Sequence, residues 1–325
     1  MKLAPPWRPV QARRAHVPGR AGAWTWAWAI AAASATAGLA LPVQAACPPA
    51  GHDVASLQAL KARQWRLDVA AAVVEAERSA LALALLDCLP DPDPALRDGI
   101  AFELLQAGLR GGSLGGPVLQ QLRQRLQARL AAPPDEAGFG QPFAALVLAE
   151  VARVDRLKPY LSAEERASLV DSAVAYLAGV RDRRGFDARE GWRHSVAHGA
   201  DLMLQLSLNP ALQRSQADAM LQAIASQVLP VGTHAWVYGE PARLAAPVFQ
   251  LARRGLLTAE DWQRWFEGLT RRPMGETGMT PAGLARRHNL QAFLTLLYTT
   301  VQESAAPEPK ALLLPALRQA LRASD

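Results

Sequence analysis

Three groups of enzyme motifs are missing from this sequence of 325 residues. It contains no Gly-x-Ser-x-Gly nucleophile elbow, no glycine-rich phosphate-binding loop and no dinucleotide-binding fingerprint. The strand-like alternation of β-branched and polar residues is almost absent as well, which argues against a protein built on sheets. These absences favour a helical protein without a recognisable nucleotide-binding or acyl-transfer site.

An excess of charge is also missing once the first 46 residues are set aside. The formal net charge of +6 comes from 35 basic and 29 acidic residues. Five bases and no acids lie in residues 1–46, so removing 5 of the 35 bases leaves 30 against 29 acids. Such a balanced chain has no electrostatic reason to bind phosphates, and we expect no nucleic-acid partner.

Residues 1–46 are typical of a Sec-type signal peptide. A basic stretch ends at Arg20, and an uncharged apolar run follows over residues 21–41. Val43 and Ala45 then satisfy the small-residue rule for cleavage, which we expect directly after this motif. The alternative is an uncleaved membrane anchor, because the apolar run is long enough to span a bilayer.

Cleavage after Ala45 or Ala46 predicts a mature chain of residues 47–325 that is periplasmic or secreted and free of the membrane. Its two cysteines, Cys47 and Cys88, would then meet an oxidising compartment, and we expect them to form a disulfide. Two free thiols, or lipidation of Cys47, are the alternatives. Their spacing matches no CxxC redox or zinc motif.

The mature chain is a succession of Ala/Leu/Arg-rich segments with helical periodicity. Its helix starts are well marked: Asp93 is an N-cap before Pro94, and capping boxes begin at Ser162 and Thr258. About a dozen helices are predicted, at 54–65, 67–87, 94–109, 117–132, 141–157, 163–180, 190–208, 215–228, 241–254, 259–270, 281–302 and 308–322.

Paired helices with short connections favour an α-solenoid. Residues 85–105 resemble a HEAT repeat, because one helix ends, the chain turns through Asp-Pro, and a second helix begins. No strict period recurs over the whole chain. We therefore predict an all-α, HEAT/armadillo-like helical array that forms a single domain over residues 47–325.

One predicted helix, 190–208, carries a polar stripe. At 100° per residue, His194, His198 and Asp201 share one narrow face, whereas Trp192 falls on the apolar side and is expected in the core. Histidines at i and i+4 with a nearby carboxylate are suited to a divalent metal such as zinc. The same stripe also fits a buried hydrogen-bond network between helices, or a solvated face.

Further polar residues lie outside this helix. Arg184, in a charged loop, is suited to bidentate binding of carboxylates or phosphates, although a solvated loop explains it equally well. The other candidates for the same polar pocket are Tyr238, Glu240, His288 and Asn289.

These residues resemble the signature of the bacterial family called domain of unknown function 2785. The resemblance is carried by Arg184-Gly185-Phe186, by the run GWRHSVAHGADL at 191–202, by Tyr238-Gly239-Glu240 and by Asn289-Leu290. It extends over most of the mature chain. The resemblance implies an all-helical fold and a shared site around these residues, and it supplies no activity or substrate.

The sequence therefore predicts an exported binding module for a protein or a small-molecule ligand, with a polar pocket around the 191–201 segment. The alternative is a metal-dependent, hydrolase-type enzyme in which a His/His/Asp site activates a water molecule.

Overall fold

The computed structural model describes residues 47–66, 71–271 and 279–324. The expected signal segment and the first residues of the helix expected at 67–87 lie outside the described residues. The described residues belong to one compact unit. None of their helices is long and apolar enough to cross a membrane.

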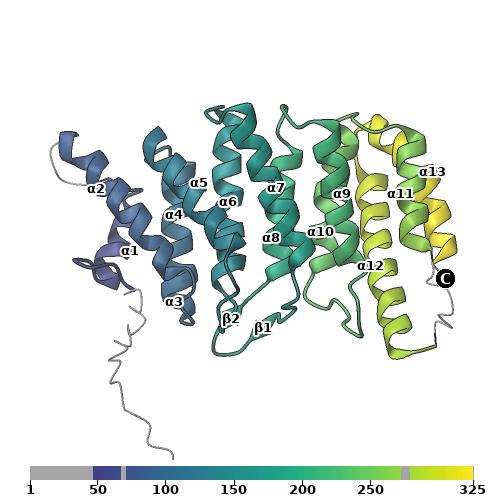
Figure 1. The fold of residues 1–325 in the computed structure, drawn as a ribbon, viewed down its shortest axis with the longest axis horizontal. Coiled ribbons are helices and arrows are strands. Elements are labelled where there is room, and N and C mark those ends of the chain that lie inside the picture. The colour runs from purple at the N-terminus through teal and green to yellow at the C-terminus, as the bar shows by residue number, and fades with distance from the viewer. Residues whose placement is uncertain (1–46, 67–70, 272–278, 325) are drawn as a thin grey trace, which may run out of the picture. The chain divides into compact units, whose positions relative to one another are not determined.

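The described part of the chain is almost wholly helical (Figure 1). Each of the twelve predicted helices has a counterpart, which confirms the all-α prediction. The helices are α1 (Val54–Ala62), α2 (Ala71–Ala84), α3 (Pro94–Leu96), α4 (Glu103–Arg110), α5 (Gly116–Ala131), α6 (Gly140–Leu157), α7 (Ala163–Gly179), α8 (Ser195–Ser207), α9 (Arg214–Val228), α10 (Glu240–Arg253), α11 (Ala259–Thr270), α12 (Pro281–Glu303) and α13 (Pro307–Ala323). A 3-10 turn, η1 (Leu85–Cys88), follows α2, and a π-helical segment, η2 (Arg97–Phe102), joins α3 to α4.

The marked helix starts behave as predicted. The Asp93 carboxylate accepts a hydrogen bond from the Ala95 N–H at the start of α3, with Pro94 in the first helical position. Ser162 and Thr258 each close a reciprocal capping box at the starts of α7 and α11. These side chains satisfy backbone N–H groups that have no partner within a helix.

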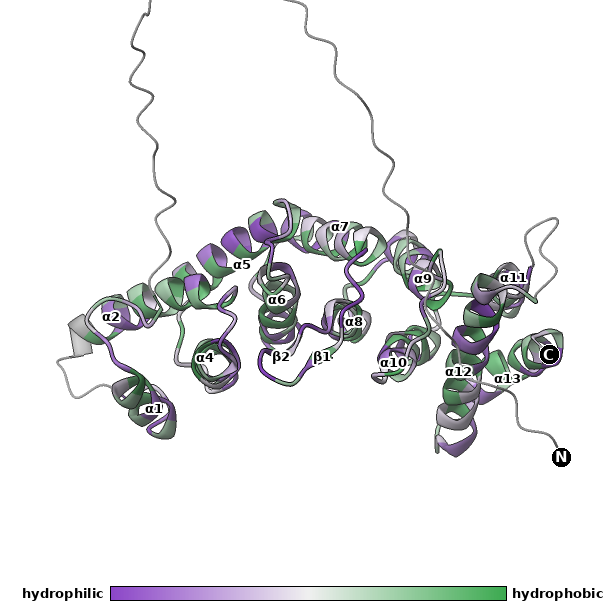
Figure 2. Ribbon diagram, turned by 90° about the horizontal axis from the view of Figure 1, so that it is seen from below, coloured by the Kyte–Doolittle hydropathy of each residue, from purple (hydrophilic) through white to green (hydrophobic). Residues whose placement is uncertain are grey.

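The helices lie in two rows (Figure 2). One row runs through α2, α5, α7 and α9, and the other through α1, α4, α6, α8, α10 and α12. Neighbours within a row contact each other, and α5–α6, α7–α8 and α9–α10 contact across the rows. Leu, Val and Phe side chains between the rows form a continuous core. The loops at one edge of this array hold the candidate site.

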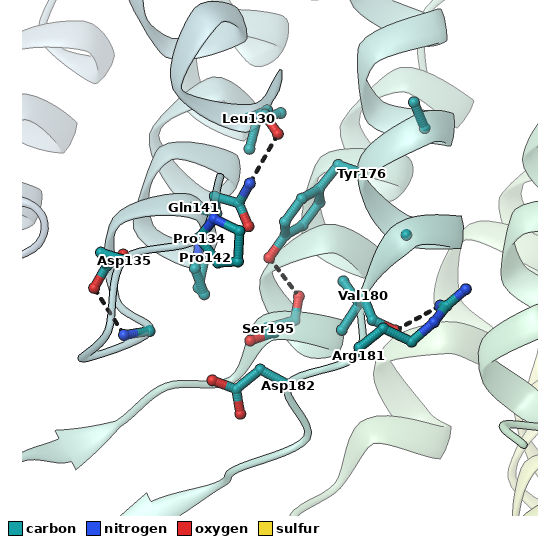
Figure 3. A pocket seen from close by; sticks show the side chains of 13 residues that line it. Leu130, Pro134, Asp135, Gln141, Pro142, Tyr176, Val180, Arg181, Asp182 and Ser195 are labelled. Atoms are coloured by element: carbon teal, nitrogen blue, oxygen red, sulfur yellow. Dashed lines mark hydrogen bonds between the residues drawn. The ribbon is translucent and has the colours of Figure 1, made fainter. Parts of the chain in front are cut away.

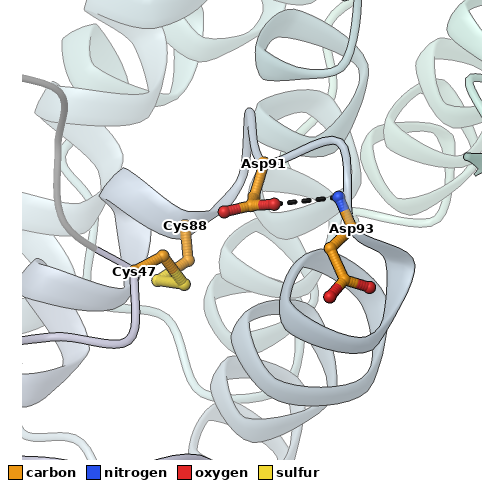
Figure 4. The surroundings of a disulfide bond; sticks show 4 residues. All are labelled: Cys47, Cys88, Asp91 and Asp93. Carbon is orange, nitrogen blue, oxygen red and sulfur yellow. Dashed lines mark hydrogen bonds between the residues drawn. A yellow bond between two sulfur atoms is a disulfide. The ribbon is translucent and has the colours of Figure 1, made fainter.

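The structure contains a disulfide between Cys47 and Cys88, with the two Cα atoms 5.2 Å apart (Figure 4). Cys88 is fully buried at the end of η1. The bridge therefore fastens the first described residue to the core, next to the turn in which the Asp91 carboxylate accepts from the Asp93 N–H.

We expect loss of this bridge to destabilise the protein. The two cysteines are 41 residues apart, and closing a loop of that length stabilises by about 4 kcal/mol on the chain-entropy model. The double variant Cys47→Ala/Cys88→Ala should lose about this much free energy of unfolding in urea titrations followed by circular dichroism. Thiol labelling of the unreduced, denatured wild type should find no free thiol; two labelled cysteines, or a double variant as stable as wild type, would contradict the prediction.

Candidate functional site

The segment before α8 is a short hairpin, so the prediction of a helix from residue 190 is wrong at its start. Strand β1 (Phe186–Asp187) pairs antiparallel with β2 (Gly191–Trp192). The Asp187 carboxylate closes the turn by accepting from the Arg189 and Glu190 N–H groups. The predicted helix is present from residue 195 onward. The residues before it are not helical, because they form the paired strands and the turn between them.

A glycine is needed at Gly191 for two reasons. Its φ of 75° lies in the left-handed region, and a Cβ atom there would come within 3.2 Å of Arg97 Nη2. The hairpin thus lies directly against a buried arginine, which is the contact that fixes its position.

Arg97 is fully buried and joins three segments. Its Nη1 donates to the carbonyls of Asp91 and Pro92, at 3.0 and 3.1 Å, and its Nη2 donates to the Glu190 carbonyl at 2.8 Å. The guanidinium carbon lies 3.8 Å from the centre of the Phe139 ring. The Arg97 side chain therefore holds the turn after η1, the start of α6 and the hairpin together.

A second buried arginine, Arg193, reinforces this arrangement. Its Nε donates to the Ala137 carbonyl at 2.8 Å and its Nη2 pairs with the Glu190 carboxylate at 2.5 Å. Its guanidinium also lies over Phe139, 4.5 Å from the ring centre. The residues on both sides of β2 are thus fastened to the protein, leaving Trp192 between them.

Trp192 belongs to an aromatic surface and not to the core, so the prediction that it packs inside is wrong. Its ring stacks on His194 at 4.1 Å with an interplanar angle of 3°, and Phe186 and Tyr238 lie against it at 4.8 and 5.5 Å. Phe186, Trp192 and Tyr238 are 50%, 37% and 41% exposed. We call Phe186, Trp192, His194 and Tyr238 the aromatic cluster; Tyr238 lies so close over Gly185 that a Cβ atom there would overlap its ring.

His194 and His198 are one helical turn apart, since the His198 N–H donates to the His194 carbonyl at 2.9 Å, but only His198 lies within α8. His194 is the N-cap of α8, in a left-handed conformation with φ of 52°. Its ring centre is 5.7 Å from that of the buried His198, which packs edge-on against Phe143. The Nδ1 atoms of both histidines are buried and have no hydrogen-bond partner.

Both imidazoles are kept neutral. Burial lowers the pKa of His194 to about 4, and the positive charge of Arg243 adds to this effect. Burial likewise lowers the pKa of His198 to about 3, with further contributions from His194 and Arg243. The site therefore presents two uncharged rings beside a cation.

Asp201 does not join the histidines in a three-ligand set. Both of its carboxylate oxygens are bound by the Arg243 guanidinium of α10, one of them at 2.7 Å from Nε. Burial raises the pKa of the Asp201 carboxyl, and the bond to Arg243 opposes that rise. Among the described residues, no group of three His, Cys, Asp or Glu side chains is placed to hold a metal ion.

The later candidates lie on the neighbouring loop and on α12. Glu240 is buried, and its carboxylate accepts from the Tyr238 N–H at 2.9 Å. Asn289 is also buried: it accepts from the Trp236 N–H and donates to the His234 carbonyl, at 2.8 and 2.9 Å.

These contacts give the loop 229–239 a fixed course. His288 contributes through Nε2, which lies 3.3 Å from the Trp236 carbonyl. Glu240, His288 and Asn289 thus shape the loop that places Tyr238 in the aromatic cluster, and their contacts are with the backbone.

Arg184 lies apart from the histidines. Its guanidinium is held by the Asp182 carboxylate, with Nη2 at 2.5 Å, and a longer contact of 3.4 Å reaches the Glu136 carbonyl. It fixes the loop before the hairpin. Sequence reasoning assigned no role in the site to Arg97, Phe139 and Arg243. Arg97 follows the Asp93-Pro94 helix start by one turn, and that position is a weak signal of a buried guanidinium that binds carbonyls of the preceding turn.

Fold and site together define the class: an all-helical protein of two packed rows, with an aromatic and histidine-bearing hairpin at one edge. Residues 126–299 match the family described as Protein of unknown function (DUF2785). The match spans more than half of the chain, and the protein belongs to this family. No curated protein and no solved structure matches it significantly.

The buried contacts of Arg97 lead to a stability prediction. Arg97→Met keeps the apolar stem but leaves the carbonyls of Asp91, Pro92 and Glu190 without their donor, and we expect a loss of about 3 kcal/mol in the free energy of unfolding. Arg189→Met, at an exposed arginine of the same hairpin, should change it by less than about 0.5 kcal/mol. Equal urea midpoints for the two variants would show that Arg97 does not fasten the hairpin.

His198 makes stability fall in acid. Above about pH 6.5 the His198 ring is mostly neutral in both the folded and the unfolded protein. Below this pH the ring is protonated in the unfolded chain but stays neutral in the folded protein, where its pKa is about 3. Between pH 6.5 and 4.5 this difference should remove about 2–3 kcal/mol from the free energy of unfolding. His198→Gln should make that part of the pH profile roughly half as steep, because His194, whose pKa is lowered to about 4, still contributes. His52→Gln, at an exposed histidine, should leave the slope unchanged. A profile that is equally steep in both variants would contradict the prediction.

Proposed function

We propose that the protein is an exported binding module, a HEAT-like helical array that uses the aromatic cluster to hold a protein or small-molecule ligand. The two rows of helices, in which successive neighbours contact each other, support the comparison with HEAT arrays, whose repeats stack side by side. The Cys47–Cys88 disulfide supports a periplasmic or secreted location, because such bonds persist in oxidising compartments.

The observation that carries the proposal is that Phe186, Trp192 and Tyr238 are exposed and yet held rigidly. Exposed rings add little to the core, and aromatic side chains are enriched among the residues that dominate binding energies. Arg97 and Arg193 fasten the hairpin, and Asn289 and Glu240 fasten the loop of Tyr238. A surface that is ordered before binding loses less entropy when a ligand arrives.

The polar groups around the cluster add selectivity. His194 provides a neutral ring stacked on Trp192, and the Arg243–Asp201 pair provides donors at the partly exposed guanidinium. A ligand that places a flat apolar surface on the rings and an acceptor near Arg243 fits this arrangement best.

The test begins with capture of ligands on immobilised mature protein from a cell-envelope extract, followed by measurement of Kd. Trp192→Ala and Tyr238→Ala should each weaken binding by about 2 kcal/mol, roughly thirtyfold in Kd, with melting temperatures close to wild type. Leu157→Ala, which removes another exposed apolar side chain, should leave Kd unchanged. Unchanged affinity in both aromatic variants would rule out the cluster as the binding surface.

A metal-dependent hydrolase is the second candidate, and one observation favours it. The buried Nδ1 atoms of His194 and His198 have no partner, and their rings are close enough for a zinc ion to contact both. A bound ion would complete its coordination with water, which it would activate as a nucleophile.

Zinc titration of the mature protein tests this candidate. If zinc binds there, it should raise the melting temperature of wild type and of Asp201→Asn, whose carboxylate is engaged by Arg243, but not that of His194→Ala or His198→Ala. Calorimetry should give one ion per chain. The absence of any zinc-dependent shift in wild type would end the metal hypothesis.

A further inference from the structure

A cavity of about 290 Å³, partly open to solvent, lies beside the start of α8 (Figure 3). It is formed where the loop before α6 and the first turn of α6 face the last turn of α7. Its lining is mostly apolar, with Leu130, Pro134, Pro142, Tyr176 and Val180 among the walls. Ser195, the first residue of α8, closes one end.

The walls of this cavity are held by hydrogen bonds of their own. The Gln141 amide donates to the carbonyls of Leu130 and Ala132, at 3.0 and 2.6 Å. The Asp135 carboxylate accepts from the N–H groups at the start of α6, including that of Gly140 at 2.7 Å. The buried Tyr176 hydroxyl donates to the Ser195 carbonyl at 3.1 Å. The space is therefore fixed before any ligand enters, as in most small-molecule sites.

The lining also defines the chemistry of an occupant. Its two carboxylates are already engaged, Asp135 by backbone N–H groups and Asp182 by Arg184. The guanidinium of Arg181, the arginine in the lining, donates to the carbonyls of Ala178 and Val180. The remaining, mostly apolar walls favour an uncharged, apolar occupant.

We propose that this cavity is a binding site for a neutral, predominantly apolar small molecule. The site is separate from the aromatic cluster, because none of the cluster's four residues lines the cavity. Ser195 follows His194 directly, so an occupant would pack against the first turn of α8 from behind.

The test uses indole, which is neutral, flat and small enough for the cavity. Isothermal calorimetry on the full mature protein should show saturable binding of one indole per chain. Gly179→Leu should obstruct it: Gly179 lines the cavity, and a Cβ atom there meets no other atom within 4 Å, so leucine fits without a clash and is expected to narrow the space. We expect at least about tenfold weaker binding in this variant, because filled volume excludes the ligand.

Three further variants test the location of the bound indole. Gly268→Leu, at an open helical glycine of α11, should bind indole as wild type does. Trp192→Ala should also bind it normally; loss of binding there would place indole on the aromatic cluster and overturn the proposal. The double variant Ala175→Leu/Gly179→Leu, with both residues in the lining, should abolish binding. The proposal would also be overturned if Gly179→Leu and Ala175→Leu/Gly179→Leu bound indole with unchanged affinity, or if the wild type did not bind indole.

Discussion

The position of the site depends on one buried guanidinium. Arg97 binds the carbonyls of the turn after the disulfide-linked η1 and that of Glu190, 93 residues further along the chain, while it lies over the Phe139 ring. Burying a charge is costly unless its hydrogen bonds are satisfied. The adjacent Asp98 carboxylate pairs with the Arg97 guanidinium at 2.6 Å and offsets part of that cost. The carbonyls and the Phe139 ring add to this only when all three segments are in place, so the side chain favours one arrangement of turn, helix start and hairpin.

Fixing the hairpin has consequences for the residues that follow it. Arg193 is bound to the Ala137 carbonyl, and His194 then takes a left-handed conformation before α8 begins. Such a conformation costs on the order of 1 kcal/mol in a non-glycine residue. Here it turns the imidazole onto the Trp192 ring and next to His198. The strain is thus associated with the most distinctive feature of the surface, the stacked pair of rings.

The segment from the hairpin to the first turn of α8 has two unlike sides. Toward the hairpin it presents aromatic rings, two neutral histidines and the Arg243–Asp201 pair. Toward α7 it closes a mostly apolar cavity at Ser195. Arg243, which binds Asp201 of α8, also helps to keep the histidines uncharged, because its positive charge lowers the pKa of both rings. The backbone position of residues 191–198 therefore determines both the stacking of Trp192 on His194 and the burial that keeps His194 and His198 neutral.

Local sequence determined the helices and their caps, because the 3.6-residue period and the capping side chains at Asp93, Ser162 and Thr258 act within a few residues. The family signature likewise identified the segment around His194 and His198. The tertiary structure alone decided how that segment is used. Strand β2 (Gly191–Trp192) pairs with β1 (Phe186–Asp187) and is anchored by the distant Arg97, so that α8 begins only after His194 and Trp192 is exposed. Asp201 is bound by Arg243. Helical periodicity could not predict this, because the contacts of Arg97 and Arg243 join residues that are 93 and 42 positions apart.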